Sequence, residues 1–153
     1  MLIIGIDPAF RKNGFAMSIM DTNTKFVEFK IFKNGYVDFV KWLMFARPDT
    51  ALFIIENSNL IKKSWQKNSI SVGKNQAISQ ITVDILRVFY DNENVIEISP
   101  VEKGKKIESL KEFDLYAKCW VLSNYKNLVC EQDKRDAFKL CLIAYNRTKN
   151  ARI

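Results

Sequence analysis

Histidine is absent from this chain of 153 residues. Its absence excludes a histidine general base, serine–histidine–aspartate and cysteine–histidine catalytic arrangements, and any zinc site with a histidine ligand. Cysteine is scarce, because only Cys119, Cys130 and Cys141 are present and no two of them form a C-x-x-C pair. An odd number of cysteines argues against a full disulfide framework, so we expect three small apolar core residues in a reducing compartment.

Long hydrophobic runs are also missing. No stretch approaches the roughly 20 apolar residues that a membrane-spanning helix needs. The apolar run at the N-terminus is only a few residues long, lacks a basic start and is followed at once by Asp7, which differs from a signal peptide. The sequence therefore predicts a cytoplasmic protein without a membrane partner.

The composition of the chain favours one basic globular domain that covers residues 1–153. Hydrophobic residues make up 48% of the chain and aromatic residues 12%, which is enough for a single core. Lysine and arginine number 24 against 17 acids, for a formal net charge of +7. This balance favours a nucleic-acid partner over an acidic protein or a small anion, although a merely soluble basic protein has the same composition.

The hydrophobic pattern predicts an α/β fold with a mixed five-stranded sheet and helices on both faces. The first three strands are joined by short turns and should form an antiparallel meander, with the third strand near an edge. A long polar loop over residues 57–73 is the kind of segment that usually has a function. We expect strands at 2–6, 14–20, 25–32, 51–56 and 94–98, and helices at 36–43, 74–89, 105–122 and 132–147.

Four acids occupy informative positions in this order of elements. Asp7 ends the first apolar run and Glu56 ends the fourth, while Asp133 and Asp136 are three residues apart on one face of the last helix. If the first and fourth strands are neighbours and the helix end faces the sheet, the four carboxylates converge. Such a cluster requires cations, because like charges raise one another's pKa and buried charges are costly.

Magnesium or manganese suits these oxygen ligands. Two such ions about 4 Å apart can hold a phosphodiester, activate a water and stabilise the leaving oxygen without histidine. Each acid also has a simpler interpretation. Asp133 suits a helix N-cap, Asp136 suits the first turn of a helix, Asp7 suits the turn before Pro8, and Glu131 is an alternative ligand to Asp133. The four acids taken together favour the metal site.

These motifs resemble those of the RuvC-type Holliday junction resolvases. The opening G-I-D-P-A with the following G-F-A resembles the family's G-I-D-P-G…G-[YF]-A, and Ile55-Glu56 resembles its second acidic strand. The closing D-K-R-D-A resembles its D-x-x-D-A. The S-P-V-E-K segment is similar to the one that carries a DNA-contacting lysine after the fifth strand. The resemblance spans residues 1 to about 146.

The resemblance implies a ribonuclease-H-like fold and a homodimeric, Mg²⁺-dependent endonuclease, with Mn²⁺ able to substitute. Such an enzyme nicks two strands of a four-way DNA junction symmetrically. It implies that Asp7, Glu56, Asp133 and Asp136 are the metal ligands and that residues 74–89 are the candidate dimer helix. The short, basic, histidine-free form resembles a phage or divergent member, in the cytoplasm of a bacterium or a phage-infected cell.

Two positions depart from the family pattern. Ala9 stands where the family usually has glycine, and alanine would be strained there if the turn required a positive φ. The family's aromatic residue shortly after the second acid is missing, and Trp65 is a candidate to replace it. These departures leave open how a junction would be distorted and which sequence would be cut.

The basic residues near the predicted site form the candidate DNA-binding surface. The polar loop combines lysines with an aromatic side chain and has no acid, a composition that suits phosphate contacts and base stacking. The alternative is a solvated loop around a core tryptophan. Lys134 and Arg135, inside the D-x-x-D motif, either face DNA or offset the acids. The candidate DNA-binding residues are Arg11, Lys12, Lys62, Lys63, Trp65, Lys67, Lys74, Lys103, Lys105 and Lys106.

Three other functions remain open from the sequence. A nuclease of the same fold that acts on other branched DNA or on RNA-containing duplexes would use the same acids. A non-catalytic junction-binding protein would share the basic surface, although the presence of all four acids argues against it. The actin-like kinases also have a G-[IL]-D turn after their first strand, but they need two such domains and a much longer chain.

Overall fold

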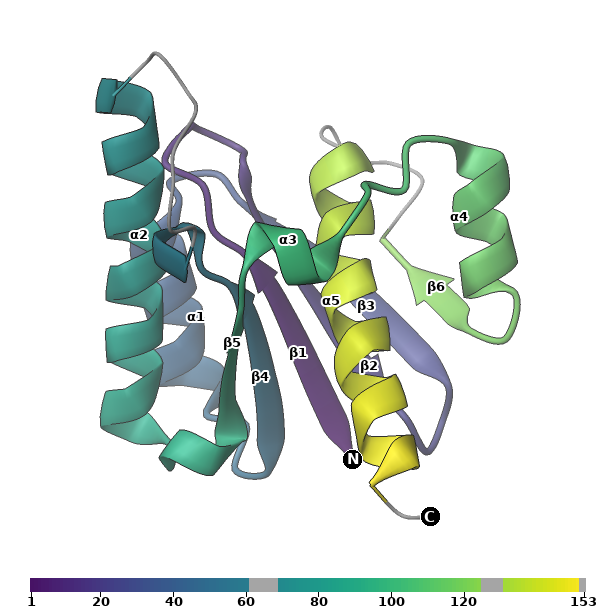
Figure 1. Ribbon diagram of the computed structural model, residues 1–153. Helices are drawn as coiled ribbons and strands as arrows, with labels where there is room; N and C mark the ends of the chain where they lie inside the picture. The colour runs from purple at the N-terminus through teal and green to yellow at the C-terminus, as the bar shows by residue number, and fades with distance from the viewer. Residues whose placement is uncertain (61–68, 125–130, 152–153) are drawn as a thin grey trace.

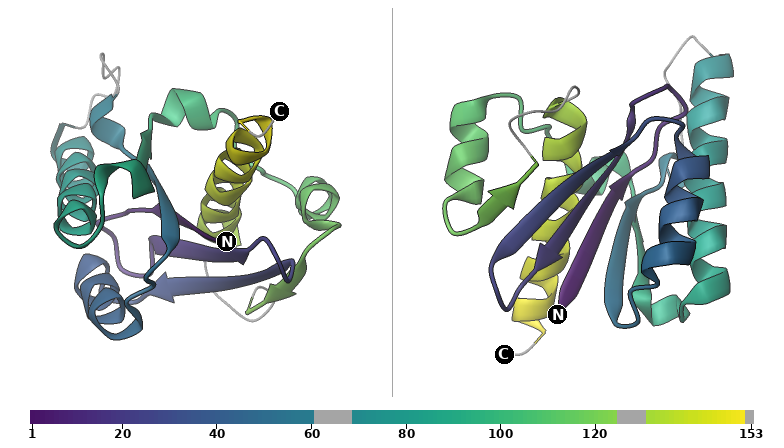
Figure 2. Two further views of the ribbon diagram at one scale, coloured as in Figure 1. Left: turned by 90° about the horizontal axis from the view of Figure 1, so that it is seen from below. Right: turned by 180° about the vertical axis from the view of Figure 1, so that it is seen from behind.

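The computed structural model describes residues 1–60, 69–124 and 131–151. In this part of the chain a six-stranded mixed sheet lies between two layers of helices (Figure 1, Figure 2). The strand order across the sheet is β5-β4-β1-β2-β3-β6. The strands are β1 (Leu2–Asp7), β2 (Phe15–Asp21), β3 (Phe26–Phe32), β4 (Ala51–Glu56), β5 (Val95–Ile98) and β6 (Val121–Ser123).

The directions of the strands agree with the predicted arrangement. β1, β2 and β3 form an antiparallel meander, and β4 runs parallel to both β1 and β5. The predicted proximity of the first and fourth strands is confirmed, because Ile6 of β1 is opposite Ile55 of β4. Parallel neighbours end at the same edge of a sheet, so the last residues of β1 and β4 lie side by side.

Helices cover both faces of the sheet, as predicted. α1 and α2 pack on one face, while α5 and α4 pack on the other (Figure 2). The helices are α1 (Tyr36–Ala46), α2 (Ser69–Phe89), α3 (Pro100–Lys103), α4 (Leu110–Ala117) and α5 (Glu131–Asn150), with 3-10 turns η1 (Ser58–Leu60) and η2 (Asn92–Asn94). Within the described ranges, no helix is both long enough and apolar enough to cross a membrane.

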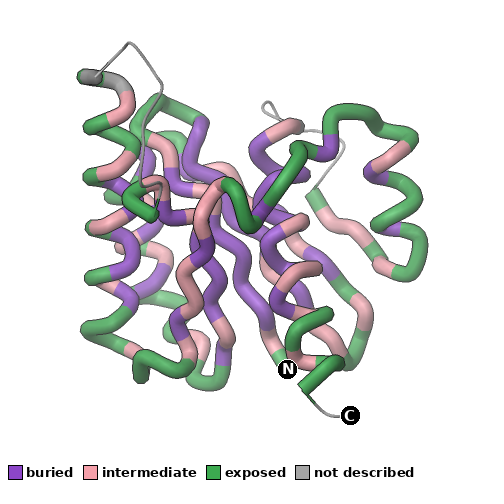
Figure 3. Tube along the Cα trace, in the orientation of Figure 1, coloured by how far each residue is buried: buried purple, intermediate pink, exposed green. Residues whose placement is uncertain are grey.

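The central strands are buried on both faces, which explains why they read as continuous apolar runs. Successive side chains of β1 alternate between the two cores: Ile3 packs in the layer with α5, whereas Ile4 and Ile6 pack in the layer with α1 and α2. Figure 3 shows this burial along the middle of the sheet. Phenylalanine rings fill both layers, among them Phe29 and Phe138 on one side and Phe15 and Phe39 on the other.

The predicted helix over residues 105–122 is wrong at both ends. The helical part is α4 alone, and the chain then returns as β6 beside β3. Trp120 donates its backbone N–H to the Ala117 carbonyl, and Val121 donates to the Lys25 carbonyl, which joins the chain to the sheet. This sixth strand also takes the edge position that was predicted for β3. α2 begins at Ser69, five residues before the predicted start at Lys74.

Gly5 allows α5 to lie directly on β1. A Cβ at Gly5 would stand 2.3 Å from the Ala137 carbonyl oxygen and 2.9 Å from Cys141 Sγ. The Cys141 thiol is buried in this crossing and donates to the Ser18 carbonyl oxygen at 3.3 Å. Burial raises the pKa of this thiol to about 12, so the thiol remains protonated. This close approach sets the position of the first turns of α5 relative to the end of β1.

Substituting Gly5 with alanine is expected to destabilise the fold by about 2 kcal/mol or more, because the added methyl group requires α5 to move away from the sheet. Gly73→Ala is the matched control, since a Cβ at Gly73 meets nothing within 4 Å. In α2 that change is expected to stabilise by about 0.5–1 kcal/mol. Urea unfolding followed by circular dichroism measures both. Equal stabilities of the two variants would refute the role of Gly5.

Candidate active site

Three structural elements bring the four predicted acids to one edge of the sheet. Asp7 is the last residue of β1 and Glu56 the last residue of β4. α5 runs antiparallel to β1 across the sheet, so its first turns, which carry Asp133 and Asp136, lie at the same edge (Figure 1). The charges of Glu56, Asp136 and Asp133 all raise the pKa of Asp7, so these three carboxylates lie within electrostatic range of it.

Burial and neighbouring charges both act on the Asp7 carboxyl group. Burial raises the pKa of its carboxyl group to about 7, and the charges of Glu56, Asp136 and Asp133 also raise it, while Lys103 opposes them. The site therefore holds more negative charge than its own cations balance.

Lys103 lies within the acid cluster. Its side chain is only 5% exposed, its ammonium forms an ion pair with Glu56 Oε2, and the distance from Nζ to Asp136 Oδ2 is 3.8 Å. Burial alone would lower the pKa of this lysine, but the charges of Asp7, Glu56 and Asp136 outweigh burial and raise the pKa. The ammonium is therefore charged and acts as a counter-ion for these acids.

Asp133 has a counter-ion of its own. Arg11 reaches it from the turn after β1, with 2.6 Å between Nη2 and Oδ2. The Arg11 side chain is 65% exposed, whereas that of Asp133 is 12% exposed, so the pair lies where the cluster opens to solvent. Asp136 accepts a hydrogen bond from Gln132 Nε2 at 3.0 Å.

The simple interpretation of Asp133 as an N-cap does not fit, because α5 begins two residues earlier, at Glu131.

The turn between β1 and β2 accommodates the departure from the family pattern at position 9. Asn13, with a φ of 56°, takes the left-handed conformation in this turn, and Ala9 is not among the described residues with positive φ. Gly14 donates its N–H to the Arg11 carbonyl oxygen and closes the turn. A Cβ at Gly14 would stand 2.3 Å from Arg11 Cγ, so glycine leaves room for the arginine that contacts Asp133.

The donor chemistry of the cluster fits a hard divalent cation. Four carboxylates supply oxygen ligands, and the raised pKa of Asp7 indicates that additional positive charge would be favourable. The carboxylates are nevertheless not spaced as metal ligands. Among the residues that the structure describes, no three acids, cysteines or histidines are close enough to share one metal ion. Glu56, Asp136 and Asp133 interact instead with Lys103 and Arg11.

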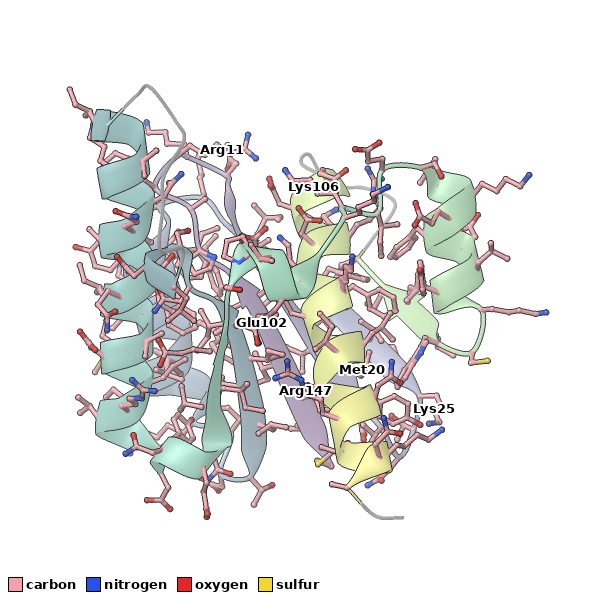
Figure 4. All side chains as sticks on the ribbon, in the orientation of Figure 1. Arg11, Met20, Lys25, Glu102, Lys106 and Arg147 are labelled. Atoms are coloured by element: carbon pink, nitrogen blue, oxygen red, sulfur yellow. The ribbon has the colours of Figure 1, made fainter. Side chains whose placement is uncertain are left out.

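The predicted DNA-binding residues separate into three groups. Arg11 and Lys106 are exposed near the acid edge (Figure 4), and Lys12, Lys74 and Lys105 are exposed as well. Lys103, also predicted to bind DNA, is buried, whereas Lys105 and Lys106 of the same segment are exposed. Lys62, Lys63, Trp65 and Lys67 lie outside the described residues.

Lys134 and Arg135 support the fold from within the D-x-x-D motif. Both are buried, and Arg135 donates from Nε to the Ile107 carbonyl oxygen at 2.8 Å. Lys134 donates to the Asn124 carbonyl oxygen at 3.5 Å. These hydrogen bonds attach the first turns of α5 to the segments around Asn124 and Ile107.

Two residues that the sequence did not single out lie beside the candidate site in the chain. Asn57 directly follows Glu56 and is buried, and it donates to Glu97 Oε1 at 2.6 Å and accepts from the Asn59 backbone at 2.9 Å. These bonds hold the chain as it leaves β4. Phe10 is 53% exposed beside the acid edge, and the Lys74 ammonium lies 4.8 Å from its ring centroid. The position of Phe10 between Asp7 and the basic residues Arg11 and Lys12 is the sequence signal that could have identified it.

Two solved structures share this architecture. A fowlpox virus resolvase, determined in complex with its substrate Holliday junction DNA, has a TM-score of 0.55 at 20% identity, over 97% of this chain and 99% of that one. T. thermophilus RuvC, in complex with a Holliday junction substrate, has a TM-score of 0.54 at 10% identity, over 97% and 96%. The chain has the fold of these resolvases.

The predicted ribonuclease-H-like fold is thereby confirmed, with one strand more than the five expected. No protein-family model matches the chain, and no curated protein matches it in sequence.

The raised pKa of Asp7 predicts that Asp7→Asn stabilises the metal-free protein at neutral pH. The folded-state pKa of about 7 exceeds the ordinary value of 3.8, so the contribution of Asp7 to stability is complete below pH 3.8 and is lost as the pH rises through 7. The expected gain of the variant at pH 8 is about 2 kcal/mol, less than the shift implies because the site keeps solvent contact.

Thermal unfolding in EDTA at pH 5 and pH 8 measures this effect. The difference in Tm between variant and wild type should widen at pH 8. Asp114→Asn, which removes an exposed carboxylate from α4, is the control and should change Tm little at either pH. An Asp7→Asn protein no more stable than wild type at pH 8 would contradict the proposed electrostatics.

Proposed function

We propose that this protein is a metal-dependent endodeoxyribonuclease that resolves four-way DNA junctions by paired nicks. The observation that carries the proposal is the convergence of four carboxylates at the ends of β1, β4 and the first turns of α5, in the fold of two junction resolvases. The net charge of +7 supports a polyanionic substrate.

Asp7, Glu56, Asp133 and Asp136 are the residues that would hold Mg²⁺ or Mn²⁺. The chemistry supplied by such ions is activation of the attacking water and stabilisation of the leaving oxygen. The chain itself binds and orients the DNA. Arg11 and Lys12 follow Asp7 in the turn at the acid edge, and Lys105 and Lys106 follow α3, so phosphates can be bound on both sides of the acids.

The cleavage assay compares an immobile four-way junction with a linear duplex of matching sequence, each with Mg²⁺, Mn²⁺ or EDTA. Symmetrically paired nicks on the junction alone, with at least a 10²-fold loss in Asp7→Asn, are the expected result. Cutting of the duplex, of flaps or of RNA-containing duplexes would identify a less selective nuclease on the same fold. Tight binding without cutting in either metal would identify an architectural protein.

Phe10 is proposed as an aromatic contact for the DNA, in the place of the family's missing aromatic residue. Its ring is exposed at the acid edge, and its backbone N–H donates to Asn75 Oδ1 at 3.3 Å, which attaches the turn to α2. Base stacking on one ring contributes about 1–3 kcal/mol, so Phe10→Ala should weaken junction binding by roughly 5- to 100-fold.

Fluorescence anisotropy with a labelled junction in EDTA measures that affinity, and 2-aminopurine near the crossover reports stacking. Phe26→Ala is the control, because Phe26 is 41% exposed at the start of β3, at the opposite end of the sheet. Equal affinities of the two variants would remove Phe10 from the DNA surface. A junction affinity that does not fall with added salt would contradict phosphate contacts altogether.

A homodimer formed through α2 is the proposed assembly. The apolar residues of this helix divide between two faces: Ile78, Val83 and Leu86 are buried in the core, whereas Ile81 and Val88 are exposed. Ile70, Ala77, Ile81 and Val88 recur at helical spacing on the exposed side. A two-fold dimer matches a four-way junction, since each subunit then cuts one strand.

Ile81→Glu combined with Val88→Glu is expected to convert the dimer to a monomer, because each carboxylate would be buried at the interface. Light scattering after gel filtration measures the mass. Leu115→Glu on α4, where Leu115 is 70% exposed, is the control and should leave the mass unchanged. A wild-type protein that is already monomeric at micromolar concentration would refute the dimer.

A further inference from the structure

The one-turn helix α3 directs the side chain of Lys103 toward the acids. Ser99 Oγ accepts a hydrogen bond from the Glu102 N–H at 3.1 Å, and Glu102 Oε2 accepts one from the Ser99 N–H at 2.8 Å. Pro100 occupies the first position, and Gly104, with a φ of 71°, ends the turn directly after the lysine. Such reciprocal capping stabilises a turn that is too short to form on its own.

Basic residues of α5 hold this segment against the helix that carries two of the acids. Arg147 pairs with Glu102 at 3.8 Å, from Nη2 to Oε1, and these two side chains are labelled in Figure 4. Lys139 Nζ donates to the Lys105 carbonyl oxygen, and Arg135 donates to the Ile107 and Glu108 carbonyl oxygens. The segment from α3 to residue 108 is therefore fastened at several points, and the direction of Lys103 is determined by the fold.

The burial of Lys103 contrasts with its neighbours. Lys103 is 6% exposed, whereas Lys105 and Lys106 on the same segment are exposed. Burying an ammonium is costly unless carboxylates offset the loss of hydration. Here Glu56 and Asp136 do so, and these are two of the four acids proposed to bind metal.

We propose that Lys103 is a resident counter-cation that competes with the divalent ion for Glu56 and Asp136. In the metal-free protein the ammonium neutralises the acids and keeps the cluster folded. A divalent ion that binds these two carboxylates must displace the ammonium or bind beside its positive charge, so Lys103 raises the metal concentration at which the site fills. This inference rests on the proposed function, because it concerns the same acids.

The competition makes two opposite predictions for Lys103→Met. The metal-free variant should have a lower Tm than wild type, because the acids lose their counter-ion. Its affinity for Mn²⁺ should nevertheless rise about tenfold or more, since the competing charge is gone. An ordinary structural ion pair predicts instead that stability and metal affinity fall together.

Mn²⁺ binding is measured without DNA, by the electron paramagnetic resonance signal of free Mn²⁺, and Tm is measured in EDTA and in Mn²⁺. Lys103→Arg retains the positive charge and should keep an affinity near that of wild type. Lys111→Met removes the same charge from an exposed position on α4 and should leave the affinity unchanged. Ser99→Ala keeps the ammonium but loosens α3, and should tighten Mn²⁺ binding by a smaller factor than Lys103→Met.

If wild type binds Mn²⁺ and Lys103→Met binds it equally well or more weakly, the proposed competition is refuted. The proposed metal site itself would remain intact. If Lys103→Met does not fold, unchanged affinity in Ser99→Ala overturns it. If neither wild type nor any variant binds Mn²⁺, the metal site of the proposed function fails, and the inference fails with it.

Discussion

Electrostatic repulsion among four neighbouring carboxylates is the constraint to which the rest of this structure responds. At Asp7, burial first and then the charges of the three nearby carboxylates raise the pKa to about 7. Lys103 and Arg11 each neutralise part of the cluster, one from a buried position and one from its solvent side. Cations of the chain itself therefore stabilise the cluster. In our proposal a divalent ion competes with one of them, Lys103, for the same carboxylates.

A rigid frame makes this concentration of charge possible. α5 lies directly on β1 because Gly5 has no side chain, and the Cys141 thiol hydrogen-bonds to the sheet at the same crossing. Two phenylalanine-rich cores hold the helices on both faces of the sheet. The free energy from this apolar burial compensates for a cluster of carboxylates that by itself opposes folding.

Much of the fold was predictable because its signals are local. Continuous apolar runs indicate central strands, and short polar turns between the first three indicate a meander. The sixth strand was missed because Val121–Ser123 is only three residues long and forms only by pairing with β3, far away in the sequence. The edge position of β3 was wrong for the same reason. The start of α2 was placed too late because its first five residues include two serines and Gly73, which favour a helix less than the residues that follow.

The sequence by itself determined which chemical groups are available: four acids at strand and helix ends, no histidine, and an excess of basic residues. These follow from residue type and periodicity, which a linear pattern contains. Only the tertiary structure decided which charges meet. Lys103 belongs by sequence to a basic cluster with Lys105 and Lys106, yet α3 turns it into the acids while its neighbours face solvent. Such pairing depends on the direction of a side chain within a packed three-dimensional frame, and that direction is set by contacts between residues distant in the chain.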